Sequence, residues 1–165
     1  MRVVHYSVQH NHLHLIAEAD DARALTRGLQ GLTIRLAKRL NKHLGRKGKV
    51  FADRYHARAL KTPTEVRNTL RYVLQNARKH ALERGELLPD GAIDLCSSAP
   101  YFDGYTDRDR KRVLDAWSRD PPITAPTCWL LRTGWRRRGL LHTSDLPGRI
   151  PLRAPKTRPR NPRDA

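Results

Sequence analysis

Two residue patterns in the sequence could do chemistry, and the first is a pair of histidines. His12 and His14 flank Leu13 in a segment of alternating character, and in an extended strand residues two apart point to the same side. Two neutral imidazoles on one face can form half of a metal site. Two half-exposed histidines on a basic surface would have the same spacing, so the pattern alone leaves both readings open.

The second pattern is a tyrosine followed four residues later by an asparagine. Tyr72 and Asn76 lie in a segment of helical periodicity, where this spacing places both side chains on one side. A phenol can act as an oxygen nucleophile, and a carboxamide oxygen can complete a site for a hard divalent ion. The alternative is a tyrosine that only packs at the helix edge. Tyr55 is the rival nucleophile, which we expect to pack instead.

A hairpin is predicted to carry the histidines. Residues 2–9 and 13–19 have the composition and alternation of two strands, with turn residues between them. Residues 21–44 follow with leucines at steps of three and four, which predicts a helix that ends at Gly45.

A second helix is predicted to carry Tyr72 and Asn76. Thr62 and Glu65 have the spacing of a capping box, and the apolar periodicity continues to about residue 84. Residues 50–60, which precede this helix, are predicted to be an extended strand.

The C-terminal half has weaker patterns. A short helix is predicted over residues 107–117, and residues 127–139 contain Trp129, Trp135 and three consecutive arginines. From Pro147 onward the composition is rich in proline and basic residues, which predicts a disordered tail.

The charge of the chain indicates its class of partner. The 165 residues include 33 Lys and Arg against 16 Asp and Glu, which gives a net charge of +17 and favours binding to a polyanion, by default nucleic acid. The length excludes a large multidomain machine, and no apolar run is long enough for a membrane span or a signal peptide. We therefore expect a cytoplasmic protein without a membrane partner. The two cysteines lack the spacing of a zinc cluster.

Taken together, the patterns resemble the single-tyrosine HUH transposases, and most closely their branch called REP-associated tyrosine transposases. The resemblance covers about the first 85 residues. It rests on Asn11-His12-Leu13-His14-Leu15, on Val50-Phe51-Ala52-Asp53-Arg54-Tyr55, and on Tyr72-Val73-Leu74-Gln75-Asn76.

The resemblance implies an α+β fold, with a ferredoxin-like antiparallel sheet and packed helices. In the family a strand and a helix precede the hairpin, and Met1 leaves no room for them, so it implies a core that is N-terminally truncated. Residues 1–90 would form this catalytic core, residues 91–146 a mostly helical basic extension, and residues 147–165 the tail.

The resemblance also implies a chemistry. His12, His14 and Asn76 would hold Mg²⁺ or Mn²⁺, and Tyr72 would attack single-stranded or hairpin DNA during transposition of a mobile element. The products would be a 5′-phosphotyrosine and a free 3′-hydroxyl. Whether Tyr72 would act within its own subunit or across a homodimer stays open. The basic residues expected to contact DNA, with Arg54 first, are Lys49, Arg54, Arg58, Arg67 and Arg71.

Two other functions remain open at this stage. A non-catalytic nucleic-acid-binding protein, either a remnant or a domesticated relative, would bind through charge alone. A metal-dependent nuclease that uses water would cut DNA without forming a protein adduct.

Overall fold

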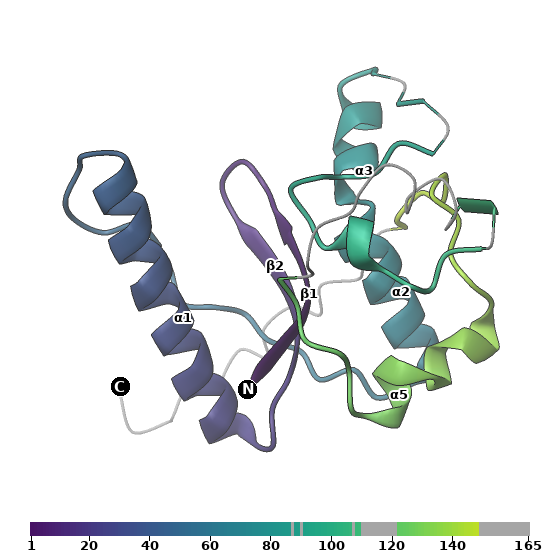
Figure 1. Ribbon diagram of the computed structural model, residues 1–165, viewed down its shortest axis with the longest axis horizontal. Coiled ribbons are helices and arrows are strands. Elements are labelled where there is room, and N and C mark those ends of the chain that lie inside the picture. The colour runs from purple at the N-terminus through teal and green to yellow at the C-terminus, as the bar shows by residue number, and fades with distance from the viewer. Residues whose placement is uncertain (87, 90, 107, 110–121, 149–165) are drawn as a thin grey trace, which may run out of the picture.

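The computed structural model has an α+β fold built on a two-stranded antiparallel sheet, which confirms the predicted class (Figure 1). It describes residues 1–86, 88–89, 91–106, 108–109 and 122–148. In chain order the elements are β1 (Arg2–Val8), β2 (Leu13–Glu18), α1 (Ala22–His43), α2 (Pro63–Leu74), α3 (Asn76–Glu83), η1 (Ala99–Tyr101), α5 (Trp129–Arg132) and η2 (Gly134–Arg138).

The hairpin is confirmed, and it contains an irregularity that alternation did not predict. Ser7 pairs with His14, but the register shifts between Val3 and His5, so that β1 has one extra residue there. Such a bulge breaks the alternation of side chains. As a result two successive residues, Val4 and His5, are both buried.

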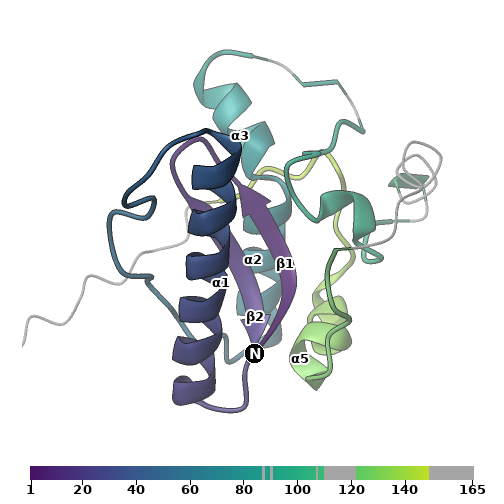
Figure 2. The same ribbon diagram turned by 60° about the vertical axis from the view of Figure 1, so that its left-hand side comes forward.

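Helices cover both faces of the hairpin: α1 lies on one side and α2 on the other (Figures 1 and 2). Asp21 caps α1 by accepting a hydrogen bond from the Ala24 N–H at 2.6 Å, and Gly45 ends it with a φ of +60°. These ends agree with the prediction. The leucine stripe is nevertheless half-exposed, and Leu29 is the one buried residue of α1.

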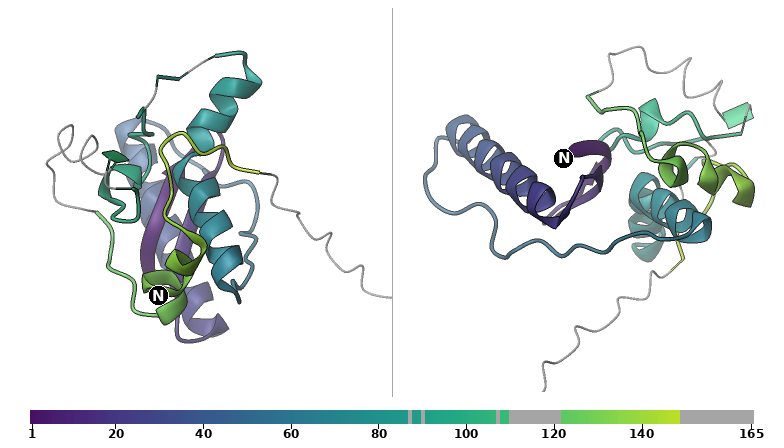
Figure 3. Two further views of the ribbon diagram at one scale, coloured as in Figure 1. Left: turned by 90° about the vertical axis from the view of Figure 1, so that its right-hand side faces the viewer. Right: turned by 90° about the horizontal axis from the view of Figure 1, so that it is seen from below.

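The predicted strand over residues 50–60 is wrong. The segment forms no strand and runs largely exposed between α1 and α2 (Figure 3). Tyr55 lies along α1 here, with its hydroxyl 2.8 Å from the Thr26 hydroxyl. The physical reason is that the segment is mostly small and charged after Phe51, and no neighbouring strand of the described chain supplies a partner ladder.

The second helix begins as predicted. The Thr62 hydroxyl accepts from the Glu65 N–H at 3.2 Å, and the Glu65 carboxylate accepts from the Thr62 N–H at 3.2 Å. The buried face of α2 then packs on the sheet and on distant segments. The shared core comprises Val4, Ile16, Val66, Leu70, Val73, Leu74, Ala99, Phe102, Tyr105, Leu131, Trp135 and Leu141.

Residues 91–146 therefore contribute to the same core as the hairpin and α2. In their described part the helical elements are short: η1, α5 and η2. Most of the helix predicted over residues 107–117, and residues 149–165 of the predicted tail, lie outside the described residues. No helix in the described part is long and apolar enough to cross a membrane.

His5 makes the stability of this core sensitive to acid. Burial lowers the pKa of its imidazole to about 4, against a weaker opposing pull from Asp103. Below pH 6.5 the unfolded chain therefore binds a proton that the folded chain refuses, so stability is complete above pH 6.5 and falls as the pH drops toward 4. Between pH 7 and pH 4.5, we expect the free energy of unfolding of His5→Gln to fall by about 2–3 kcal/mol less than that of the wild type, as measured by urea unfolding. Equal losses in the two proteins would contradict this assignment.

Candidate active site

The two imidazoles of the hairpin face each other, as the spacing predicted. The Nε2 atoms of His12 and His14 are 3.0 Å apart, and the Nδ1 of His12 lies 2.7 Å from the Asn11 carboxamide oxygen. If His12 donates through Nδ1, its Nε2 is left with a free lone pair. Two nitrogens that bind one ion at right angles, each about 2.1 Å from it, lie about 3.0 Å apart. The separation therefore suits either one N–H···N hydrogen bond or a shared divalent ion.

His14 is held in its neutral form. Burial is the main cause that lowers the pKa of this imidazole to about 4, and the nearby His12, His80 and Lys79 add to the effect. A metal ligand must be a neutral imidazole, so the surroundings of His14 favour the form that binds metal.

Tyr72 is brought to this pair by the tertiary fold. Its ring lies edge-on to the His14 ring, with 5.0 Å between the centroids. The burial of Val73 and Leu74 beside it fixes the rotation of α2, which turns Tyr72 toward β2. Lys79 places a positive charge near Tyr72: its Nζ lies 5.7 Å from the centre of the tyrosine ring.

Asn76 does not follow Tyr72 on one continuous helix. The expected helix is interrupted at Gln75, whose φ of −124° separates α2 from α3, and Asn76 becomes the first residue of α3. The Gln75 side-chain amide donates through Nε2 to the His142 carbonyl, so a distant segment binds the residue at which the helix is interrupted. The prediction of a single helix to residue 84 is therefore wrong, because the apolar periodicity continues across Gln75 and does not show the change of backbone angle there.

The Asn76 side chain is fully buried, and neither its Oδ1 nor its Nδ2 has a hydrogen-bond partner among the residues that the structure describes. Buried polar atoms without partners are rare and costly. Asn76 makes no hydrogen bond to His12 or His14, whereas contacts join His12 to His14 and His14 to Tyr72. An amide oxygen and two imidazoles are donor types that a divalent ion binds.

Among the described residues no three His, Cys, Asp or Glu side chains form a group that could hold a metal ion. A complete site would therefore need a donor of another kind, such as the Asn76 amide oxygen or a phosphate oxygen of the nucleic acid.

Asn76 gives a test in which stability and metal binding change in opposite directions. Without metal, Asn76→Leu is expected to stabilise the fold by about 1–3 kcal/mol, since it replaces an unpaired buried amide with an apolar side chain of similar size. It should also remove any rise in melting temperature that Mn²⁺ produces. The matched control, Gln75→Leu, should instead be destabilising because it leaves the His142 carbonyl unpaired. Loss of stability in Asn76→Leu would show that the amide has a structural partner.

The five basic candidates differ in their surroundings. Lys49, Arg54 and Arg58 are exposed on the segment between α1 and α2. Arg67 instead donates to the carbonyls of Gly139 and Leu140 at 2.9 and 3.1 Å, so its guanidinium holds the C-terminal segment.

Arg71 is half-buried one residue before Tyr72, and its Nε has no hydrogen-bond partner in the described part of the chain. No hydrogen bond or ion pair joins any of these five candidates to His12 or His14. Lys79 and His80, which the sequence analysis did not select, instead help to lower the pKa of His14. Their signal was present: His80 follows Asn76 by four residues, and Lys79 follows Tyr72 by seven.

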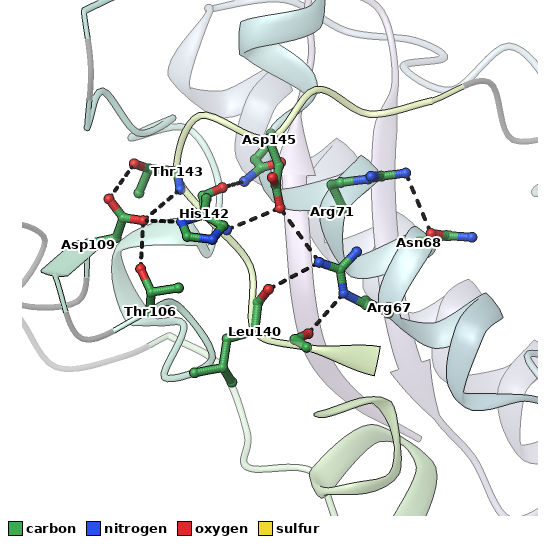
Figure 4. Close-up of polar contacts among 11 residues, drawn as sticks. Arg67, Asn68, Arg71, Thr106, Asp109, Leu140, His142, Thr143 and Asp145 are labelled. Carbon is green, nitrogen blue, oxygen red and sulfur yellow. Dashed lines mark hydrogen bonds and ion pairs between the residues drawn. The ribbon is translucent and has the colours of Figure 1, made fainter. Parts of the chain in front are cut away.

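A polar network ties the C-terminal segment to α2 (Figure 4). The Asp109 carboxylate accepts from the hydroxyls of Thr106 and Thr143 at 2.9 and 3.0 Å, and lies 3.4 Å from Nδ1 of His142. Burial alone would raise the pKa of Asp109, but these hydrogen bonds outweigh it and lower the pKa. Asp145 accepts from the His142 N–H and lies 3.8 Å from Arg67. The network thereby positions His142, whose carbonyl accepts a hydrogen bond from the Gln75 side chain.

A cavity of about 310 Å³ lies beside this network. Asp109 and His142, two of the residues that line it, use their side chains to hold each other and the neighbouring threonines. These contacts give Asp109 and His142 a structural role. We therefore place the candidate active site at the imidazole pair and Tyr72 and not at this cavity.

No family model matches this chain, and neither the curated proteins nor the solved structures contain a significant match to it.

Proposed function

We propose that this protein is a metal-dependent, single-tyrosine DNA strand transferase of the transposase type. The observation that carries the proposal is the convergence of three groups: the His12 and His14 Nε2 atoms 3.0 Å apart, with the Tyr72 ring 5.0 Å from the His14 ring. A nucleophile beside a pair of imidazoles that could hold a divalent ion is an arrangement suited to attack on a phosphodiester.

The reaction follows from these groups. The Tyr72 phenol oxygen loses its proton and forms a bond to phosphorus, while the bond from phosphorus to the 3′ oxygen breaks and that oxygen takes up a proton. The products are a 5′-phosphotyrosine and a 3′-hydroxyl. One phosphodiester replaces another, so a later attack by a 3′-hydroxyl can rejoin DNA without ATP. His12, His14 and Asn76 would hold Mg²⁺ or Mn²⁺, which supplies Lewis acidity at the phosphate oxygen.

The charge of the protein supports DNA as the substrate. A net charge of +17 attracts a polyanion such as DNA. Lys79 adds a positive charge beside the Tyr72 ring, where the charge on the attacked phosphate would lie.

A non-catalytic nucleic-acid-binding protein is the second candidate. The observation that favours it is that, among the described residues, no three His, Cys, Asp or Glu side chains form a group that could hold a metal ion. Such a protein would bind DNA with steep dependence on salt and without dependence on metal.

A cleavage assay with two labels separates these functions. The protein is incubated with hairpin DNA that carries single-stranded flanks and Mn²⁺, and the products are run on a denaturing gel. Strand transfer through Tyr72 should leave a 3′ label attached to protein and release a 5′ label on a free fragment, and EDTA should prevent both. Fragments without attached protein would indicate a nuclease that uses water. Tight binding without cleavage would indicate the non-catalytic protein.

A further inference from the structure

The segment from Trp129 to Arg138, here called the α5–η2 arm, contains two pairs of tryptophan and arginine that differ in burial. Trp135 is 1% exposed, stacks on Phe102 at 5.5 Å and donates from its indole N–H to the Leu131 carbonyl at 3.1 Å. Its arginine, Arg136, forms an ion pair with Asp103 at 2.8 Å. This first pair anchors the arm and is electrically neutralised.

The second pair faces solvent. Trp129 is 48% exposed, and the Arg137 guanidinium carbon lies 5.0 Å from the centre of its ring. The indole rests against Gly134, where a Cβ would come within 2.7 Å of the ring. The ring is therefore seated on backbone, while much of its surface remains available.

The arm is strongly basic. Arg132, Arg137 and Arg138 are exposed and form no ion pair with a carboxylate in the described part of the chain, in contrast to Arg136. Exposed aromatic rings beside unpaired guanidinium groups are the features that bind bases and phosphates of single-stranded nucleic acid.

The arm is also held in place, so that a ligand need not order it. Glu18, at the end of β2, accepts from the N–H groups of Thr127 and Cys128 at 3.0 and 2.9 Å. Burial alone would raise the pKa of Glu18, but these hydrogen bonds and one from the Thr127 hydroxyl lower it to about 2. The arm is thus attached to the strand that carries His14.

We propose that Trp129 and Arg137 form a base-stacking site for single-stranded DNA, with Arg132 and Arg138 binding the adjoining phosphates. The inference rests on the proposed function, because it extends the DNA strand beyond the imidazole pair. His14 and Glu18 are four residues apart on β2, or about 13 Å along the strand. A strand bound at both places would run along the hairpin, and the substrate would need unpaired nucleotides on that side of the cleavage point.

The ligand is DNA rather than an acidic polypeptide because a carboxylate polymer has no base to stack on Trp129. An oligo(dT) strand therefore serves as probe, against an abasic strand of equal length and against poly-glutamate. Fluorescence anisotropy measures each affinity. The wild type should prefer oligo(dT) to the abasic strand, and poly-glutamate should compete poorly.

Variants test the site directly. Trp129→Ala should weaken oligo(dT) binding about tenfold and abolish the preference over the abasic strand, whereas Trp129→Phe should keep part of that preference. Arg137→Gln should weaken binding more than the matched control Arg39→Gln, which removes an equal charge from α1. Circular dichroism melts establish that each variant is folded.

An unchanged preference for oligo(dT) in Trp129→Ala would overturn the inference, as would equal losses in Arg137→Gln and Arg39→Gln. The cleavage assay is scored separately. Binding that depends on Trp129 without a protein adduct would refute the proposed chemistry and support the stacking site. If the protein forms the adduct, and neither adduct formation nor DNA affinity changes in Trp129→Ala, the proposed chemistry would be supported and the stacking site refuted.

Discussion

Replacing Tyr72 with phenylalanine is expected to abolish covalent attachment of DNA while leaving DNA affinity within about twofold of the wild type. The change removes one hydroxyl and keeps the ring that contacts His14 at 5.0 Å, so folding and the local surface are preserved. The phenol oxygen is the atom proposed to attack phosphorus, and no phenylalanine atom can form that bond. The measurement is the amount of 3′-labelled DNA that stays with protein on a denaturing gel, alongside affinity by anisotropy.

The matched control for this experiment is Tyr55→Phe. It removes the same hydroxyl from the rival tyrosine, which binds the Thr26 hydroxyl at 2.8 Å and is well exposed. The adduct should form normally in this variant. An adduct that persists in Tyr72→Phe and disappears in Tyr55→Phe would transfer the nucleophile to Tyr55, and one that persists in both would exclude both residues.

The largest loss of stability is expected from Trp135→Ala, at about 3–5 kcal/mol. The indole is buried against Phe102, and Gly104 approaches it so closely that a Cβ there would lie 2.3 Å from the ring. Truncation would leave a large cavity at the junction of α2, η2 and the loop around residue 104, and would leave the Leu131 carbonyl without its indole donor. Urea unfolding at neutral pH measures the loss.

Trp129→Ala is the internal comparison, since it removes the same side chain from the same arm. We expect it to cost about 1 kcal/mol or less, because about half of Trp129 already faces solvent. Similar losses in the two variants would mean that the arm is not anchored through Trp135. That result would also remove the reason to treat Trp129 as a surface kept for a ligand.

The parts of the fold that depend on local patterns were predictable. The hairpin boundaries, the Asp21 and Gly45 ends of α1 and the capping box of α2 each depend on residues close together in the chain. The prediction for residues 50–60 was wrong because a strand needs a partner, and the local composition does not show whether one is available. The pairing of the His12 and His14 side chains was predictable from their spacing of two residues, although β2 begins at Leu13 and His12 lies just before it.

The sequence by itself determined the charge of the protein, both ends of α1, the start of α2 and the placement of two imidazoles on one face, since these depend on composition and short-range geometry. Only the tertiary structure decided that Tyr72 meets His14, that the helix is interrupted at Gln75, whose side chain binds the His142 carbonyl, and that Trp135 is buried while Trp129 is exposed. The physical reason is that these outcomes depend on contacts between residues far apart in the chain. Two tryptophans six residues apart have the same intrinsic preferences, and their roles differ because Phe102 and Gly104 enclose the ring of Trp135, whereas about half of Trp129 faces solvent.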